Sequence, residues 1–239
     1  MDILGLHHIT LVCSNAGKTV DFYSGLLGIR LVKRTVNFDD PTSYHLYFGD
    51  HSGRPGTLVT FFEWPNAAYG RPGIGGTHHL ALQVGNYTGL LKWKRYLVDR
   101  GVDVRGPFDR NYFKFLSLAD PDGVQIEIAT VGPGWAVDET EDEYGQEFQL
   151  PPREMLAANR DPRQIELETW PDPVDTLAPD MVLSRGLHHI TTISSDIERT
   201  NEFYADILGL QRVKMTASFD ALETRQWCWG VGPAGRPGT

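Results

Sequence analysis

The sequence predicts an α+β protein built from βαβββ modules, with two paired modules followed by a third, incomplete one. Three observations predict this. One segment recurs along the chain, each copy has the same order of strands and helix, and each copy opens on a pair of histidines. At 239 residues with 41% hydrophobic content, the chain is long enough to bury a core in one large domain or two small ones.

The repeat is visible as a constant offset between two distant segments. Leu6-His7-His8-Ile9-Thr10 returns as Leu187-His188-His189-Ile190-Thr191, and further matches keep the same register. A more divergent copy lies between them, opening with His78-His79 and closing with Gln125-Ile126-Glu127-Ile128. We therefore predict paired modules over residues 1–133, with the first at 1–65 and the second at 76–133. A linker rich in Pro, Asp and Glu should fill 134–184, and a truncated third module should fill 185–239.

Within each copy, the hydrophobic spacing changes along the chain. In the first copy, residues 6–13 are typical of a strand, and residues 16–26 have apolar side chains at helical spacing. Gly28 follows as a helix stop, and the β-rich stretches 31–36, 44–48 and 57–62 are separated by turn residues. In the second copy the helix is expected over 90–100, ended by Gly101. Each copy therefore has the order βαβββ.

Composition excludes several classes of function. The net charge of -9 and the lack of a basic tract argue against a nucleic-acid partner. No apolar run approaches the roughly 20 residues needed to cross a bilayer, and the amino terminus lacks the pattern of a secretory signal. The two cysteines are too few for a disulfide framework. We expect a cytoplasmic protein that binds a small molecule and no membrane.

The histidine pairs and one glutamate indicate a metal site. Neighbouring strand residues point to opposite faces, so one ring of each pair shares a face with apolar residues and the other faces a cavity. That argument selects His8 in the first copy and His79 in the second. Glu127 lies on the polar face of its strand, where a carboxylate is costly unless it is paired or coordinated. Two imidazoles and one carboxylate leave open coordination positions and suit Fe(II).

Each of these residues also has a purely structural interpretation. A strand histidine is more often a hydrogen-bonded structural residue than a ligand, and Glu127 alone is compatible with a salt-bridged edge residue. The recurrence of histidine at the same strand position favours the metal site. Thr60, the counterpart of Glu127 in the first copy, supplies no carboxylate, so the predicted set contains His8, His79 and Glu127.

The motifs resemble those of the vicinal oxygen chelate superfamily, which includes glyoxalases and extradiol dioxygenases. The segments 5–10, 32–41 and 44–49 are similar to the opening of the hydroquinone-type ring-cleaving dioxygenases. The resemblance implies a vicinal oxygen chelate barrel of paired modules. It also implies metal ligands on the first strand of one module and on the first and last strands of its partner, which again gives His8, His79 and Glu127.

The resemblance also implies residues near the substrate. The segment Asp109-Arg110-Asn111-Tyr112-Phe113 matches the family, and it places Arg110 and Tyr112 by the substrate. His7, Thr10 and His78 would surround the ligands, although all five residues are also compatible with ordinary strand and turn roles. Ser117 stands where related ring-cleaving enzymes have a tyrosine.

Module order also departs from the family pattern. Related enzymes have four modules with the metal-bearing one last, whereas here it would be the second, and the third copy ends before its last strand. His189 would then have no partner, and the unpaired third module would favour a homo-oligomer.

The favoured function is therefore an Fe(II)-dependent ring-cleaving dioxygenase that acts on a hydroquinone or catechol-like aromatic with O2, with Mn(II) or another divalent metal as an alternative. A glyoxalase- or epimerase-like lyase or isomerase is a second interpretation, but such enzymes usually need a second carboxylate where Thr60 stands. A third is a small-molecule-binding protein or a truncated remnant without activity.

Overall fold

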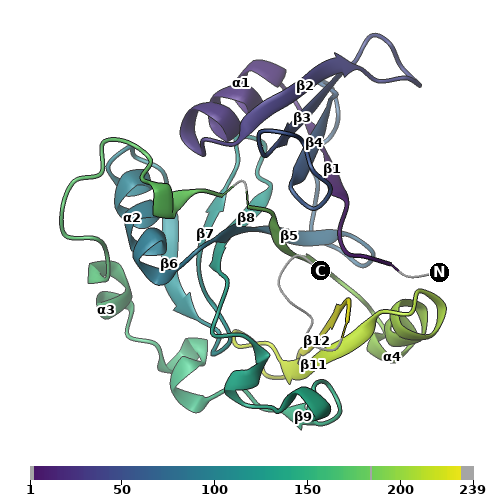
Figure 1. Ribbon diagram of the computed structural model, residues 1–239, viewed down its shortest axis with the longest axis vertical. Coiled ribbons are helices and arrows are strands. Elements are labelled where there is room, and N and C mark those ends of the chain that lie inside the picture. Colours follow the sequence, from purple (N-terminus) through teal and green to yellow (C-terminus); the bar gives the residue numbers. More distant parts are fainter. Residues whose placement is uncertain (1–2, 184, 233–239) are drawn as a thin grey trace.

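The first module has the predicted βαβββ order. The computed structural model describes residues 3–183 and 185–232, and Figure 1 shows its arrangement. The elements of this module are β1 (His8–Cys13), α1 (Ala16–Val20) continued by the π-helical turn η1 (Asp21–Leu26), β2 (Arg30–Val36), β3 (Tyr44–Gly49) and β4 (Leu58–Glu63). They form one sheet in the order β1-β4-β3-β2, with β1 parallel to β4. Gly28 ends the helix with φ 68°, a conformation that a residue without Cβ adopts freely.

The second module repeats this order with a longer helix. Its elements are β5 (Thr77–Val84), α2 (Tyr87–Val98), β6 (Val104–Asp109), β7 (Lys114–Ala119) and β8 (Gln125–Thr130). The Asn86 side chain begins α2 by accepting a hydrogen bond from the Gly89 amide at 2.8 Å. The fully buried Trp93 fixes the inner face of the helix, because its Nε1 donates to the Met181 carbonyl at 2.7 Å.

The third module is joined to the second. It contains β10 (Leu187–Thr192), α4 (Ile197–Asn201), the π-helical turn η7 (Glu202–Ile207), β11 (Gln211–Ala217) and β12 (Arg225–Gly230). β10 pairs antiparallel with β5 and extends the second sheet to the order β10-β5-β8-β7-β6. The prediction of an unpaired third module is therefore wrong for the described residues. The last part of the predicted third module, residues 233–239, lies outside them.

The predicted linker is extensively structured. It contains β9 (Phe148–Gln149), which pairs with β11, the helix α3 (Pro162–Leu167) and several single-turn helices. These turns are η2 (Trp135–Val137), η3 (Glu141–Glu143), η4 (Arg153–Met155), η5 (Ala157–Asn159) and η6 (Pro179–Met181). Its acidic residues include partners of a buried cation, since Lys214 Nζ lies 2.7 Å from both Asp138 and Glu139.

Two apolar clusters lie on opposite faces of the second sheet, and each is next to a different neighbouring module. The helix-facing sides of the first two modules share the main core, in which Tyr23 and Phe61 of the first module join Leu90 and Trp93 of the second. A smaller cluster on the opposite face of the second sheet contains Ala81, Phe115 and Ala129, flanked by Phe108 and Phe113. The third module lies toward this second face, because Phe113 contacts His188 with ring centroids 4.8 Å apart.

Module pairing therefore differs from the prediction that the first two modules enclose the site. They pack through their helix sides, whereas the second and third share a sheet through their first strands. Among the described residues, β1 pairs with β4 alone. In Figure 1 the first sheet and the β11–β12 hairpin lie at opposite ends of the molecule, with the second sheet between them. No helix among the described residues is long and apolar enough to cross a membrane.

Candidate metal centre

Three potential metal ligands converge at the junction of the second and third modules. They are His79 on β5, Glu127 on β8 and His189 on β10, hereafter the three-residue cluster. The Nε2 atoms of His79 and His189 are 3.0 Å apart. Glu127 completes the group, with Oε1 3.5 Å from His79 Nε2 and Oε2 3.7 Å from His189 Nε2.

Strand register explains why these side chains meet. In the parallel pair β5–β8, Glu127 lies opposite Ala81, and in the antiparallel pair β5–β10, His189 also lies opposite Ala81. Ala81 thus stands between two ligand-bearing strands, and its small side chain leaves room on that face. His79 lies two residues away on the same strand and therefore points to the same side. One face of three adjacent strands supplies all three groups.

The spacing fits a coordinated ion. Ligand atoms about 2.1 Å from an ion lie about 3.0 Å apart when their bonds meet at a right angle, and the two histidine nitrogens have this separation. The somewhat longer distances to Glu127 still bring all the ligand atoms within 4.8 Å of one another. Two imidazoles and a carboxylate are a donor set used for non-haem Fe(II).

The hydrogen bonds of His188 set the tautomer of His189. His188 Nε2 lies 3.0 Å from the Thr130 carbonyl, which only accepts, so this nitrogen carries the hydrogen. His188 Nδ1 then accepts from His189 Nδ1 at 2.8 Å. The lone pair of His189 Nε2 is consequently left facing the cluster, as in metal sites whose ligand imidazole is oriented by a hydrogen bond to its other nitrogen.

The same arrangement recurs at His79. Its Nδ1 lies 2.8 Å from the Nδ1 of exposed His78, so the equivalent tautomer leaves the Nε2 lone pair toward the cluster. Thr191 Oγ1 also lies 3.1 Å from that nitrogen. Without a metal, His79 Nε2 can instead carry the hydrogen and donate to His189 Nε2 at 3.0 Å, whereas in the tautomer described above a shared cation would lie between the two lone pairs. The residues present therefore fit a divalent metal.

Burial shifts all three protonation equilibria toward neutral groups. Burial raises the pKa of Glu127 to about 8, although the Arg110 guanidinium opposes the increase. Burial also lowers the pKa of His79 to about 3, with His78 and Arg110 adding to the decrease. The pKa of His189 lies well below its usual value, through burial and through His188, His79 and Arg110. Without a cation the buried carboxylate is unfavourable, and a divalent ion would stabilise its charged form.

Arg110 and the aromatic side chains lie beside the cluster. The Arg110 guanidinium lies over Phe115 and Phe219, at 5.0 and 5.1 Å from the ring centroids. Phe115 is paired with Ala129, which lies two residues from Glu127 on β8 and so shares its face of the sheet. Phe113 lies 5.4 Å from the His189 ring. The surroundings therefore combine one cation with several apolar rings.

His8 is not part of this cluster. It is exposed on β1 and contacts its neighbour His7, with 3.0 Å between their Nδ1 atoms. Thr10, which was also predicted to lie near the ligands, accepts a hydrogen bond from Thr60 within the first sheet at 2.9 Å. The prediction that His8 completes the set differs from the structure because β10, and not β1, occupies the free edge of β5. His189 takes the place expected for His8.

The other predicted residues are divided between the site and its surroundings. His78 contacts His79, a member of the three-residue cluster, directly. Tyr112 is buried against Trp135 and Phe219, and its hydroxyl has no hydrogen-bond partner. Ser117 lies opposite Glu127 in the pairing of β7 with β8, so it borders the cluster.

The sequence did not predict His189 as a potential ligand, nor His188 and Thr191 as its neighbours. The sequence does carry a signal for His189, because the alternation of strand faces selects the second histidine of the pair in the third copy. The sequence does not show which module pairs with the second module.

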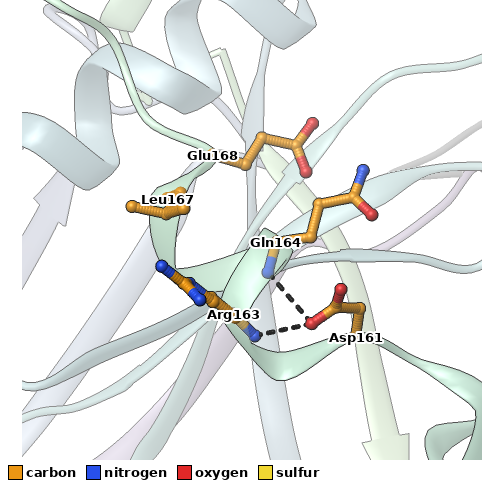
Figure 2. Close-up of a pocket in the computed structure, with 5 residues that line it drawn as sticks. All are labelled: Asp161, Arg163, Gln164, Leu167 and Glu168. Atoms are coloured by element: carbon orange, nitrogen blue, oxygen red, sulfur yellow. Dashed lines mark hydrogen bonds between the residues drawn. The ribbon is translucent and has the colours of Figure 1, made fainter.

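A separate open pocket lies away from the cluster. Figure 2 shows that it is lined by residues on and beside α3, where Asp161 accepts hydrogen bonds from the amides of Arg163 and Gln164. These contacts form an ordinary helix N-cap. The lining residues (Asp161, Arg163, Gln164, Leu167 and Glu168) include no member of the three-residue cluster.

Comparison with curated proteins gives relatives that are described as ring-cleaving dioxygenases. The chain is 33% identical over 218 residues to "Putative ring-cleaving dioxygenase MhqO" of Bacillus subtilis (strain 168), covering 90% of this chain and 58% of that protein. It is also 41% identical over 127 residues to the chlorohydroquinone/hydroquinone 1,2-dioxygenase of Sphingobium indicum, covering 52% of this chain and 39% of the relative. The chain therefore spans about three-fifths of the first relative and less of the second.

Solved structures and a family model agree with the fold. A structure described as a putative dioxygenase from Bacillus subtilis matches with a TM-score of 0.66 and 28% identity, covering 95% of this chain and 63% of that one. The glyoxalase/bleomycin resistance protein/dioxygenase model matches residues 5–128. Because that match spans more than half of the sequence, the chain belongs to the glyoxalase/bleomycin resistance protein/dioxygenase superfamily.

Proposed function

We propose that this chain binds a divalent metal through His79, Glu127 and His189 and belongs to an enzyme that cleaves the ring of a hydroquinone or catechol-like aromatic with O2. The convergence of two imidazole nitrogens and one carboxylate from three strands carries the proposal. The relatives described as ring-cleaving dioxygenases support the reaction class. Fe(II) is the preferred metal and Mn(II) the alternative, since such a set leaves coordination positions open for O2 and a substrate oxygen.

The surrounding residues suit an aromatic substrate. Phe113 lies against both His188 and His189, and its ring offers an apolar surface on which a substrate ring would pack. The Arg110 guanidinium would stabilise the negative charge of an ionised phenolic oxygen. Exposed His78, hydrogen-bonded to His79, would exchange protons with solvent.

Oxygen uptake by reconstituted protein tests the proposal. Anaerobic loading with Fe(II), followed by addition of hydroquinone or catechol in aerated buffer, should give oxygen consumption that depends on both metal and substrate. His189→Ala and Glu127→Ala should abolish it. His8→Ala is a matched control, because His8 has the same neighbours in sequence and lies outside the cluster.

The rival functions give different results. Stoichiometric metal binding without oxygen consumption on either aromatic would contradict the dioxygenase proposal. Conversion of a 2-oxoaldehyde hemithioacetal by the same metal-loaded protein would then favour the glyoxalase-like lyase or isomerase. Metal binding that survives both His189→Ala and Glu127→Ala would contradict the assignment of the site.

A further inference from the structure

One carboxylate of the third module binds two arginines, and one of them, Arg110, lies over Phe115 on the sheet face that carries the three-residue cluster. Asp220 follows β11, and its Oδ2 accepts from Arg110 Nη2 at 2.7 Å. Its other oxygen, Oδ1, accepts from Arg160 Nη1 at 2.8 Å. The three side chains come from the second module, the linker and the third module, so their contact forms only when all three segments are assembled.

Arg160 fixes Asp220 from the linker side. Its Nε donates to the Met155 carbonyl at 2.9 Å, and its guanidinium lies 5.1 Å from the centroid of Phe108. Its side chain is only 13% exposed. Asp220 is therefore bound to an anchored group, although half of its own side chain reaches solvent.

Asp220 also restricts Arg110. The backbone of Arg110 is already fixed, because its amide donates to the Phe113 carbonyl at 3.0 Å, and its guanidinium lies over two aromatic rings. Such cation–π contacts do not fix the direction of the individual N–H bonds. The hydrogen bond from Nη2 to Asp220 removes that freedom. Nη1 is buried and has no hydrogen-bond partner, so one cationic donor remains unused.

We propose that Asp220 is a positioning residue that aims Arg110 at the substrate side of the three-residue cluster, with Arg160 holding Asp220 in place. The third module then supplies one metal ligand and also orients the cation that meets the substrate oxygen. This inference rests on the proposed function, because it assigns Arg110 to an ionised oxygen of a catechol-like ligand. It concerns binding and orientation and involves no covalent step.

A double-mutant cycle on ligand binding tests the inference. The probe is 4-nitrocatechol, whose absorbance changes on ionisation, added anaerobically to Zn(II)-loaded protein so that binding is measured without turnover. Arg110→Gln and Asp220→Asn should each weaken binding roughly tenfold, as for one charge-assisted hydrogen bond. The double variant should be no weaker than Arg110→Gln, because Asp220 acts through Arg110. Independent effects that multiply would overturn the proposal.

Controls separate positioning from folding. Asp220→Glu keeps the carboxylate and should recover part of the lost affinity, whereas the exposed Asp206→Asn in the same module should leave it unchanged. Arg160→Gln should weaken binding in the same direction as Asp220→Asn, with Zn(II) content and melting temperature kept near wild type. Wild-type affinity in both Asp220→Asn and Arg160→Gln would overturn the proposal.

The double-mutant cycle tests the positioning role of Asp220 independently of any reaction with oxygen. If the Fe(II) protein consumes no oxygen but the cycle shows coupling, the dioxygenase function fails and the positioning role stands. If oxygen uptake is normal and Asp220→Asn changes neither the probe affinity nor the KM for hydroquinone, the positioning role fails alone. Absence of probe binding to wild-type Zn(II) protein would overturn the positioning role directly.

Discussion

The Nε2 atoms of His79 and His189 lie 3.0 Å apart although 110 residues separate them in the chain. The contact depends on the pairing of β10 with β5, and it puts one potential metal ligand on each side of a module boundary.

Replacing His189 should therefore remove metal binding, whereas replacing His8 should not. His189→Ala is expected to weaken Zn(II) or Co(II) binding by more than about 100-fold, because one of three ligands is lost. His8→Ala should keep the wild-type affinity and stoichiometry. Isothermal titration with metal-free protein measures both. Loss of binding in His8→Ala with retention in His189→Ala would instead favour the arrangement predicted from sequence.

Metal affinity should increase with pH up to about 8. Burial raises the pKa of Glu127 to about 8, so at lower pH the metal must displace a proton from this carboxyl group. The apparent affinity should fall about tenfold for each pH unit below that value. His79, with a pKa of about 3, is neutral near pH 7 and releases no proton. Titrations in two buffers of different ionisation enthalpy would count the protons, and an affinity independent of pH between 6.5 and 8 would contradict the assignment.

Glu127→Gln should stabilise the metal-free protein at alkaline pH. The folded-state pKa of Glu127 is above the unfolded value, so its contribution is fully present below pH 4.5 and is lost as pH rises toward 8. Between pH 6.5 and 8 the wild type should lose about 2 kcal/mol from this group, and the contributions of the buried histidines cancel in the comparison with Glu127→Gln. Glu127→Gln should lack that loss. Urea unfolding across this window measures the difference, and the exposed Glu154→Gln should behave as wild type.

The two histidines that accept from the ligands should differ in importance. His188 is buried and bonded to the Thr130 carbonyl, so His188→Phe removes an acceptor that water cannot replace. Metal affinity should fall by about 10- to 100-fold. His78 is exposed, and water can take its place, so His78→Phe should cost less. Equal losses in Zn(II) titrations of the two variants would contradict this account.

Lys214→Met should destabilise the junction between linker and third module. Its side chain is 1% exposed and pairs with Glu139, which is 2% exposed, so the change leaves a buried carboxylate without a cation. The expected loss is about 3–5 kcal/mol in the free energy of unfolding. Asp138→Asn, at a partner that is 28% exposed, should cost much less. Denaturant unfolding checks both, and a loss under about 1 kcal/mol for Lys214→Met would be inconsistent with this account.

Local features of the fold were predictable because they depend on side-chain pattern. The helix expected at 16–26 is present as α1 and η1, and the strand predicted at 44–48 is β3 with one more residue. Alternation of side chains along the strands also predicted His79 and Glu127 on one side of their sheet, where the structure brings them together.

Pairing between modules was not predictable in the same way. The edges of β1 and β10 both offer backbone amides and carbonyls to β5, and these groups are the same in every residue type except proline. Nothing in the His-His motif tells one edge from the other. The contacts of the linker were not predictable for a related reason, since the partner of Asp138 and Glu139, Lys214, is distant in sequence. The role of Asp220 likewise becomes visible only when the structure places it beside Arg110 and Arg160.

A metal ion held by β5, β8 and β10 would act as a cross-link between the second and third modules of the chain. A ligand that binds only the assembled form stabilises that form in proportion to the logarithm of its concentration. Separation of the third module would leave two ligands and release the ion, so metal loading would report on domain docking as well as on catalysis. Ions added during refolding should accordingly trap the correctly joined strands.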